Sequence, residues 1–325
     1  MALVDLLAHW NILPSAVVGH SSGEIAAAYT TGTLSAVSSW QVAFHRGRLA
    51  EELARQHPNL SGAMMAVGLS RIDMEIYIQR LRPSDAQVVS VACCNSPEST
   101  TVSGDVGLLD QLETMLKDAG VFVRRLRVKT AYHSRHMQLL ADDYRESLRH
   151  LAVSTKVNRN ASVAMYSTVT GALIRPEDLG ADYWVQNKVS PVLFDAAVQS
   201  ALQRAASGRG PLGQILQVAA GINNTNATIG YHFILQRKEN AQLSALTTAG
   251  ALWSAGVPVN VARVNSRPKT VAPWAPVIDL PRYPWNHETR YWQESTLSKS
   301  LRFRYSPRTD LLGEPVREFS WAEPT

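Results

Sequence analysis

The first thirty residues carry an apolar pattern that predicts a helix, a strand and a second helix. Residues 2–10 place apolar side chains at helical spacing, and a Pro-Ser turn at 14–15 leads into the apolar run 16–18. Three consecutive alanines at 26–28 follow, and Gly32 is suited to end a helix. The pattern therefore predicts a buried strand that turns sharply into a closely packed helix.

A longer helix is predicted next, from Ser38 and Ser39, which can cap it, to about Gln56. Small residues recur along this segment at steps of four, three and four: Ala43, Gly47, Ala50 and Ala54. Because these positions share one helix face, we expect that face to pack closely on a neighbouring element.

From residue 61 to residue 129 the pattern changes to short strands and helices. We expect strands at 63–67, 88–94, 100–103 and 121–128, with helices at 71–82 and 107–119. This order of strand, helix, two strands, helix and strand is typical of a small ferredoxin-like domain.

The core is expected to resume after this lobe. Ser134 can cap a helix whose apolar residues form one stripe: Met137, Leu140, Ala141, Tyr144, Leu148 and Leu151. The sequence becomes irregular from about 207, and beyond 265 its proline and aromatic residues are typical of a linker. We expect a core at 1–60 and 130–235, an inserted lobe at 61–129, a linker at 236–299 and the start of another domain at 300–325.

Composition excludes several classes of protein. Of the 325 residues, 45% are hydrophobic and 18% are charged, which suits a folded chain with a large core. The sequence shows neither a membrane span nor a signal peptide, so we expect a soluble, cytoplasmic protein. Cys93 and Cys94 are chain neighbours, which disfavours a disulfide or a four-ligand metal site. The net charge of +5 is too diffuse to indicate nucleic-acid binding.

The sequence Gly19-His20-Ser21-Ser22-Gly23 is a GxSxG nucleophile elbow between the predicted strand and helix. In that setting Ser21 projects from the helix N-terminus as a nucleophile, and the Ser22 amide points to the place where an oxyanion forms. The alternative is a glycine-rich turn that only joins the strand to the helix.

Arg46 and His133 are the candidate partners of Ser21. Arg46 lies on the buried side of the predicted second helix, where its planar fork could bind a substrate carboxylate or form a structural ion pair with Glu24. His133 stands between the last lobe strand and a helix N-terminus, whose positive end would help to keep the imidazole neutral, as a general base must be. The alternative for His133 is a structural or surface histidine.

Together these residues resemble the acyltransferase domain of iterative fungal type I polyketide synthases, the family of malonyl-CoA:acyl carrier protein transacylases. The resemblance rests on GHSSGEIAAAY, FHRGR and AYHSRHM, with support from NSPESTTVSGD and YWVQNKVSPVLF, and runs from Met1 to about Asn265. LPRYPWNHETRYW resembles the linker after such a domain, and SPRTDLLGEPV resembles the first strand of a dehydratase domain.

The resemblance implies an α/β-hydrolase-like parallel-sheet core with an inserted ferredoxin-like subdomain. It also implies transfer of a malonyl group from malonyl-CoA, through an ester on Ser21, to the phosphopantetheine thiol of an acyl carrier protein. His133 would be the base and Arg46 the malonyl carboxylate ligand, with His20, Ser22 and Tyr132 also lining the substrate site. The ring of Tyr132 would exclude the α-methyl group of methylmalonyl. The expected partners are the carrier protein, a ketosynthase and a dehydratase, and no cofactor is expected on this segment.

The sequence departs from the family pattern in two places. The family's first strand, which supplies the second oxyanion donor, is not found before Ser21, and a Gly-Pro-His segment is replaced by LQVAAGINNTNATIGYHF. We therefore expect a fragment of a larger synthase with impaired activity. Two rivals remain: a serine esterase, and a catalytically impaired fragment that serves as a structural or interaction module.

Overall fold

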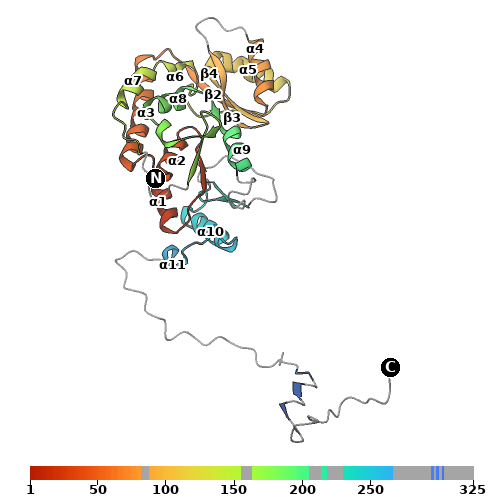
Figure 1. Ribbon diagram of the computed structural model, residues 1–325. Coiled ribbons are helices and arrows are strands. Elements are labelled where there is room, and N and C mark those ends of the chain that lie inside the picture. Colours follow the sequence, from red (N-terminus) through yellow and green to blue (C-terminus); the bar gives the residue numbers. More distant parts are fainter. Residues whose placement is uncertain are drawn as a thin grey trace. The chain divides into compact units, whose positions relative to one another are not determined.

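The computed structural model describes residues 1–81, 88–154, 163–204, 214–217 and 230–265, together with residues 294, 295, 298, 299, 302 and 303. The chain divides into two compact units, Met1–Ser266 and Arg267–Thr325. The candidate site lies wholly in the first unit, which mixes helices and strands as the predicted α/β class requires (Figure 1).

A small sheet carries the nucleophile turn. Strand β1 (Ala16–Val18) pairs in parallel with β6 (Ala164–Ser167), and β6 pairs antiparallel with β7 (Ala172–Leu173). Helix α1 (Ala2–His9) precedes β1, and α2 (Gly23–Thr30) follows it after a four-residue turn. The predicted order of helix, strand, sharp turn and helix is therefore confirmed.

Helix α3 (Ala36–Gln56) begins and packs differently from the prediction. Its N-cap is Ser35, which accepts a hydrogen bond from the Ser38 amide, so the expected capping by Ser38 and Ser39 is wrong. Ala43, Gly47 and Ala54 face solvent. The buried face instead carries larger side chains together with Ala50: Ser38, Ser39, Val42, Arg46, Leu49 and Leu53. The apolar members of this set gain more by burial than the small residues would.

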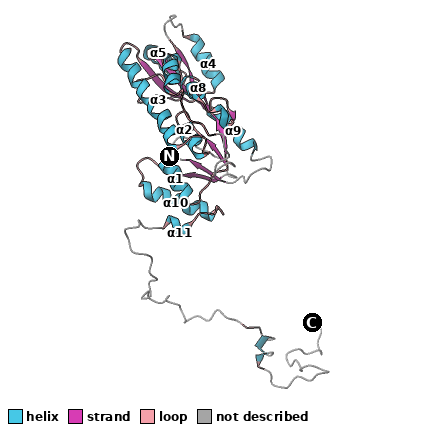
Figure 2. Ribbon diagram, turned by 60° about the vertical axis from the view of Figure 1, so that its left-hand side comes forward, coloured by secondary structure: helices cyan, strands magenta, loops and turns pink. Residues whose placement is uncertain are grey.

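The expected ferredoxin-like lobe is present (Figure 2). Its elements are β2 (Gly62–Val67), α4 (Arg71–Arg80), β3 (Val89–Ser96), β4 (Ser99–Asp105), α5 (Val106–Asp118) and β5 (Val123–Arg125). The sheet order is β5-β2-β4-β3-β8, in which β8 (Val192–Leu193) comes from the core and pairs in parallel with β3. Strand β8, which follows α8 (Ala181–Val189) in the sequence, therefore ties the core to the lobe sheet.

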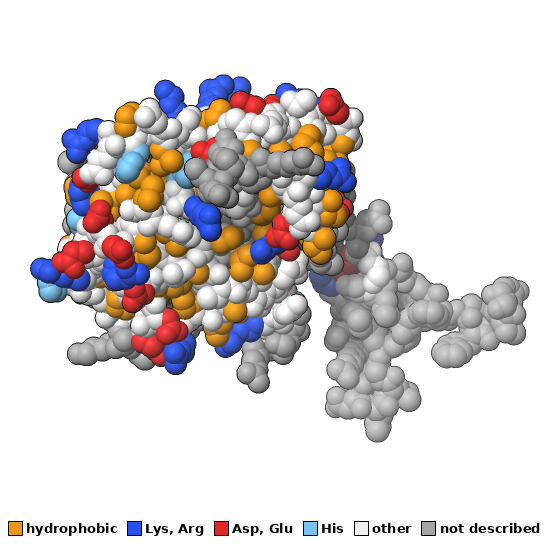
Figure 3. Space-filling model, turned by 90° about the horizontal axis from the view of Figure 1, so that it is seen from above, with side chains coloured by type: hydrophobic (Ala, Val, Ile, Leu, Met, Phe, Trp, Pro, Cys, Tyr) orange, Lys and Arg blue, Asp and Glu red, His pale blue; other side chains and the backbone are white. Residues whose placement is uncertain are grey.

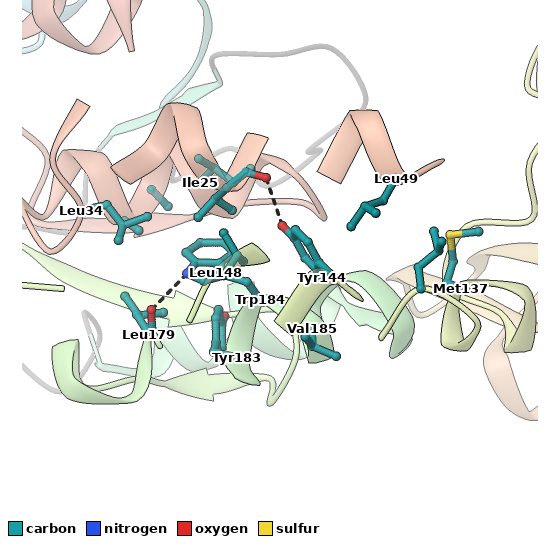
Figure 4. Packing of buried hydrophobic residues seen from close by; sticks show 14 of the residues in the cluster. Ile25, Leu34, Leu49, Met137, Tyr144, Leu148, Leu179, Tyr183, Trp184 and Val185 are labelled. Carbon is teal, nitrogen blue, oxygen red and sulfur yellow. Dashed lines mark hydrogen bonds between the residues drawn. The ribbon is translucent and has the colours of Figure 1, made fainter. Parts of the chain in front are cut away.

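The segment after His133 forms two short helices where one was expected. Ser134 caps α6 (Arg135–Gln138), and α7 (Ala141–Ser147) begins after a break at Leu139 and Leu140. The predicted apolar stripe is buried with α2, α3 and α8 (Ala181–Val189) in the main core (Figure 4). There the Tyr144 hydroxyl donates to the Val42 carbonyl at 3.1 Å.

Further elements complete the first unit. They are a 3₁₀ turn η1 (Pro176–Asp178), α9 (Phe194–Arg204), the parallel pair β9 (Gln214–Gln217) and β10 (Gly230–Phe233), α10 (Ala241–Ser254) and α11 (Val261–Val264). Ala245, Ala249 and Leu252 of α10 share a buried cluster with Leu7 and Trp10 at the start of the chain. The compact unit therefore includes thirty-one residues, 236–266, of the linker expected at 236–299. Most of the rest of that linker, and most of 300–325, lie outside the described residues.

None of the described helices is both long and apolar enough to cross a membrane. On the face of the molecule shown in Figure 3, basic and acidic side chains are interspersed rather than gathered by sign.

Candidate active site

Ser21 occupies a strained turn at the end of β1. Its backbone φ is +54°, in the left-handed region that non-glycine residues seldom adopt. Gly19 makes the turn possible, because a Cβ atom there would lie 2.3 Å from the backbone nitrogen of Glu24. The nucleophile elbow predicted by the GxSxG motif is thus present in the backbone geometry.

Ser21 and His133 form a hydrogen-bonded pair. The Oγ atom of Ser21 lies 2.7 Å from Nε2 of His133, and Nδ1 of His133 lies 2.8 Å from the backbone carbonyl oxygen of Ser190. That carbonyl can only accept, so it assigns the proton of the neutral ring to Nδ1. Nε2 is then free to accept the hydroxyl proton of Ser21.

The surroundings of His133 keep its imidazole neutral. Burial, followed by the guanidinium of Arg46 and then by His20, lowers the pKa of His133 to about 4. The sequence analysis expected a helix N-terminus to keep the ring neutral, but α6 has only four residues, and burial and the Arg46 guanidinium are the largest causes of the lowered pKa.

Arg46 reaches the same point from α3. Its side chain is buried, its Nη2 donates to Ser21 Oγ at 3.1 Å, and its Nη1 donates to Oδ1 of Asn187 at 2.8 Å. Burial lowers the pKa of Arg46, yet an arginine stays protonated throughout the physiological range. A cation therefore lies within hydrogen-bond distance of the Ser21 hydroxyl.

The alternative ion pair between Arg46 and Glu24 is not formed. The carboxylate of Glu24 accepts hydrogen bonds from Thr168, Tyr183 and Asn187 instead. Asn187 thus stands between the two charged groups. It was missed as a site residue, and so were Ser190 and Lys188, although all three lie in the segment YWVQNKVSPVLF.

Lys188 adds a second buried basic group beside Arg46. Its Nζ donates to the backbone carbonyl of Arg46 at 2.8 Å and lies 5.0 Å from the centre of the Tyr144 ring. Burial and the charge of Arg46 lower the pKa of Lys188 to about 7.

The other predicted site residues line the same region with different exposures. The amide of Ser22 has no backbone acceptor among the described residues. His20 is exposed; its Nε2 lies 2.8 Å from Oδ1 of Asn95 on β3, and its ring is 5.3 Å from that of Phe194. Tyr132 is half-buried and packs between the main core and a cluster that includes β8.

The arrangement suits covalent acyl transfer. It combines a serine hydroxyl in a strained turn, a neutral imidazole whose tautomer is fixed, an available backbone amide and a buried guanidinium. In the described part of the chain, no group of three or more His, Cys, Asp or Glu side chains is placed to hold a metal ion.

Comparison with known proteins agrees with this chemistry. The family model of the acyl transferase domain matches residues 1–209. The highly reducing polyketide synthase Preu1 of Preussia isomera is 41% identical over 347 aligned residues, which cover 100% of this chain and 14% of that synthase. The highly reducing polyketide synthase cnsI of Penicillium expansum is 40% identical over 336 residues, covering 97% of this chain and 14% of its own length.

The fold is shared with solved acyltransferase structures. The acyltransferase domain from module 8 of the salinomycin polyketide synthase has a TM-score of 0.67 and 29% sequence identity, covering 80% of this chain and 60% of that one. The chain spans 14% of the length of the first fungal relatives. It belongs to the acyl transferase domain family, and it is similar along almost its whole length to fungal highly reducing polyketide synthases.

Proposed function

We propose that this domain transfers a malonyl group from malonyl-CoA to the phosphopantetheine thiol of an acyl carrier protein during polyketide synthesis. The observation that carries the proposal is the convergence of Arg46 and His133 on the single oxygen Ser21 Oγ, at 3.1 and 2.7 Å. A base and a carboxylate-binding cation on one nucleophile suit an acyl group that carries its own negative charge.

The first half-reaction uses His133 twice. As Ser21 Oγ attacks the thioester carbonyl, its proton passes to Nε2 of His133, and the Ser22 amide faces the developing oxyanion. When the intermediate collapses, the carbon–sulfur bond breaks and the imidazolium returns the proton to the departing thiolate. The products are a malonyl ester on Ser21 and free coenzyme A.

The second half-reaction reverses these steps with another thiol. The carrier's phosphopantetheine thiol gives its proton to His133 and attacks the ester carbonyl, and Ser21 Oγ leaves with the proton. The Ser190 carbonyl keeps Nδ1 protonated in both halves, so Nε2 alone exchanges the proton.

Arg46 would select the acyl group. Its Nη2 rests on Ser21 Oγ, and a malonyl carboxylate would replace that contact while Nη1 keeps its bond to Asn187. Such anchoring also positions the thioester carbonyl beside the nucleophile. An acetyl group has no carboxylate and gains neither effect.

Tyr132 would limit the size of the extender. Tyr132 directly precedes His133 in the sequence, and its ring is half-buried. We expect this ring to occupy the space that the α-methyl group of methylmalonyl would need. We expect malonyl-CoA to acylate the protein faster than methylmalonyl-CoA does. In Tyr132→Ser, intact-mass assays should show a smaller difference between these two acylation rates. A native preference for methylmalonyl-CoA would contradict this role.

The test of the function is covalent. Incubation with malonyl-CoA should add the mass of one malonyl group, and peptide mapping should place it on Ser21. Ser21→Ala should abolish the adduct, whereas a label that persists in this variant refutes the assignment.

The same preparation separates the rivals. A serine esterase would release malonate by hydrolysis, whereas a transferase hands the group to a pantetheine thiol faster than to water. A structural fragment would form no adduct.

A further inference from the structure

Glu24 is a carboxylate buried under the nucleophile turn with no exposed surface. Its Oε1 accepts from the Thr168 amide at 2.5 Å and lies 3.1 Å from the Thr168 hydroxyl, whose single proton is shared with the Gly19 carbonyl at the same distance. Its Oε2 accepts from the Tyr183 hydroxyl at 2.6 Å and from Nδ2 of Asn187 at 2.7 Å. The Thr168 amide, the Tyr183 hydroxyl and Nδ2 of Asn187 make the burial of this charge tolerable, and of these groups only Asn187 also contacts Arg46.

The side-chain amide of Asn187 has a fixed orientation. Its Nδ2 donates to Glu24 and, at 3.1 Å, to the backbone carbonyl of Ser21, while its Oδ1 accepts from Nη1 of Arg46 at 2.8 Å. A carboxylate can only accept and a guanidinium can only donate. The two charged neighbours therefore allow one orientation of the amide between them.

We call the contacts from Glu24 through Asn187 to Arg46 the relay. The relay holds the Arg46 guanidinium without pairing it directly with a carboxylate. An acidic side chain in direct contact would form a bidentate pair with the guanidinium and compete with a substrate carboxylate. The neutral amide of Asn187 engages Nη1 alone, and Nη2 remains directed at Ser21 Oγ.

We propose that Glu24, acting through Asn187, is the positioning residue for the guanidinium of Arg46 and thereby sets the preference for malonyl over uncharged acyl groups. The proposal rests on the proposed function, in which Arg46 binds the malonyl carboxylate. Glu24 itself touches neither the substrate nor the reacting atoms.

Glu24→Gln tests the relay because it changes hydrogen-bond direction at nearly constant volume. The Thr168 amide cannot turn, so the glutamine oxygen must stay on that side and its NH₂ group must face Asn187. Two donors then oppose each other unless the amide of Asn187 flips. A flipped amide presents Nδ2 to Nη1 of Arg46 and releases the guanidinium from its position.

The experiment measures the rates at which malonyl-CoA and acetyl-CoA acylate Ser21 in the full chain. Glu24→Gln should lower the malonyl-to-acetyl rate ratio by about tenfold, the size of one lost hydrogen bond to a charged group. The matched control is Tyr183→Phe, which removes a different donor from the same carboxylate and leaves the limb through Asn187 intact. It should lower the melting temperature while changing the ratio by less than about twofold.

Two results would overturn the relay. Equal loss of both acylations in Glu24→Gln, or an equal change of ratio in Tyr183→Phe, overturns the relay and leaves Glu24 a structural carboxylate. If Glu24→Gln does not fold, Asn187→Ala takes its place and should produce the same loss of ratio. Wild-type protein that shows no malonyl preference, or Arg46→Ala that retains it, refutes the proposed function instead.

Discussion

Ser21 and His133, which are 112 residues apart in the sequence, meet at 2.7 Å, and both adopt a left-handed backbone conformation. Their φ angles are +54° and +59°. Backbone strain persists only where surrounding contacts fix it, and here it falls on the two residues whose side chains are hydrogen-bonded to each other.

Ser21→Gly should be more stable than Ser21→Ala by about 1 kcal/mol, because glycine adopts a positive φ without a Cβ clash. Both variants should lack acylation. Urea unfolding measures the difference. Ala26, in the middle of α2, provides the control, since Ala26→Gly should lower stability at a position with ordinary helical φ. A glycine penalty at both positions would show that Ser21 is unstrained.

Arg46→Ala should reduce malonylation of Ser21 far more than acetylation, by about tenfold or more in their ratio, because the lost fork bound only the charged substrate. Intact-mass kinetics with the two thioesters measure it. Arg48→Ala is the matched control on the same helix, since Arg48 is exposed and pairs with Glu52. Its ratio should equal that of the wild type.

Acylation should persist in mildly acidic solution, because the pKa of His133 is lowered to about 4. The imidazole of His133 then stays mostly neutral from pH 8 to pH 5. For a histidine with the ordinary pKa, the neutral fraction at pH 5 would be only about one in thirty. Quenched-flow acetylation measures the profile. In Arg46→Met the nearby cation is gone, so the acidic limb should move to higher pH; an unmoved limb would leave burial as the sole cause.

Stability should rise with pH above neutrality because of Lys188. The pKa of Lys188 is lowered to about 7 in the folded protein, whereas an unfolded lysine holds its proton to about pH 10. Between these values the unfolded state binds the extra proton, so the free energy of unfolding gains up to about 1.4 kcal/mol per pH unit from this group.

Lys188→Met should abolish that slope between pH 7 and 8.5 and should also raise stability at pH 7, since it removes a poorly solvated amine from the core. Lys129→Met, a change at an exposed lysine, should leave the slope unchanged. Parallel slopes in wild type and Lys188→Met would assign the pH dependence to other groups. Urea titrations at three pH values measure all three proteins.

Local pattern predicted the elements of the site better than it predicted their packing. The strand, turn and helix around Ser21 follow from residues within fifteen positions of one another. Arg46 was placed on the buried face of its helix, although the small residues thought to define that face, Ala43 and Gly47, are exposed. The face is set by Val42, Leu49 and Leu53, whose larger apolar areas outweigh the small residues.

The contacts that orient the site could not be predicted from local pattern. Ser190 is 57 residues from His133 and uses only its backbone, which any residue type supplies. Asn187 lies 141 residues from Arg46, and an asparagine within a helix carries no signal of its partner. Glu24 did offer a signal, as the one acidic residue in an otherwise apolar and alanine-rich helix, and its buried network gives the reason.

Strand β8 links His133 to the boundary between the core and the lobe. Its residues Val192 and Leu193 pair with Cys93 and Cys94 of the lobe, the Leu193 amide donates to the Thr168 carbonyl of the core, and the Ser190 carbonyl that holds His133 lies two residues before it. A rotation of the lobe against the core would pull on this peptide and tilt the imidazole. The lobe and His133 are therefore coupled, because a displacement of the lobe against the core would also change the distance between His133 and Ser21.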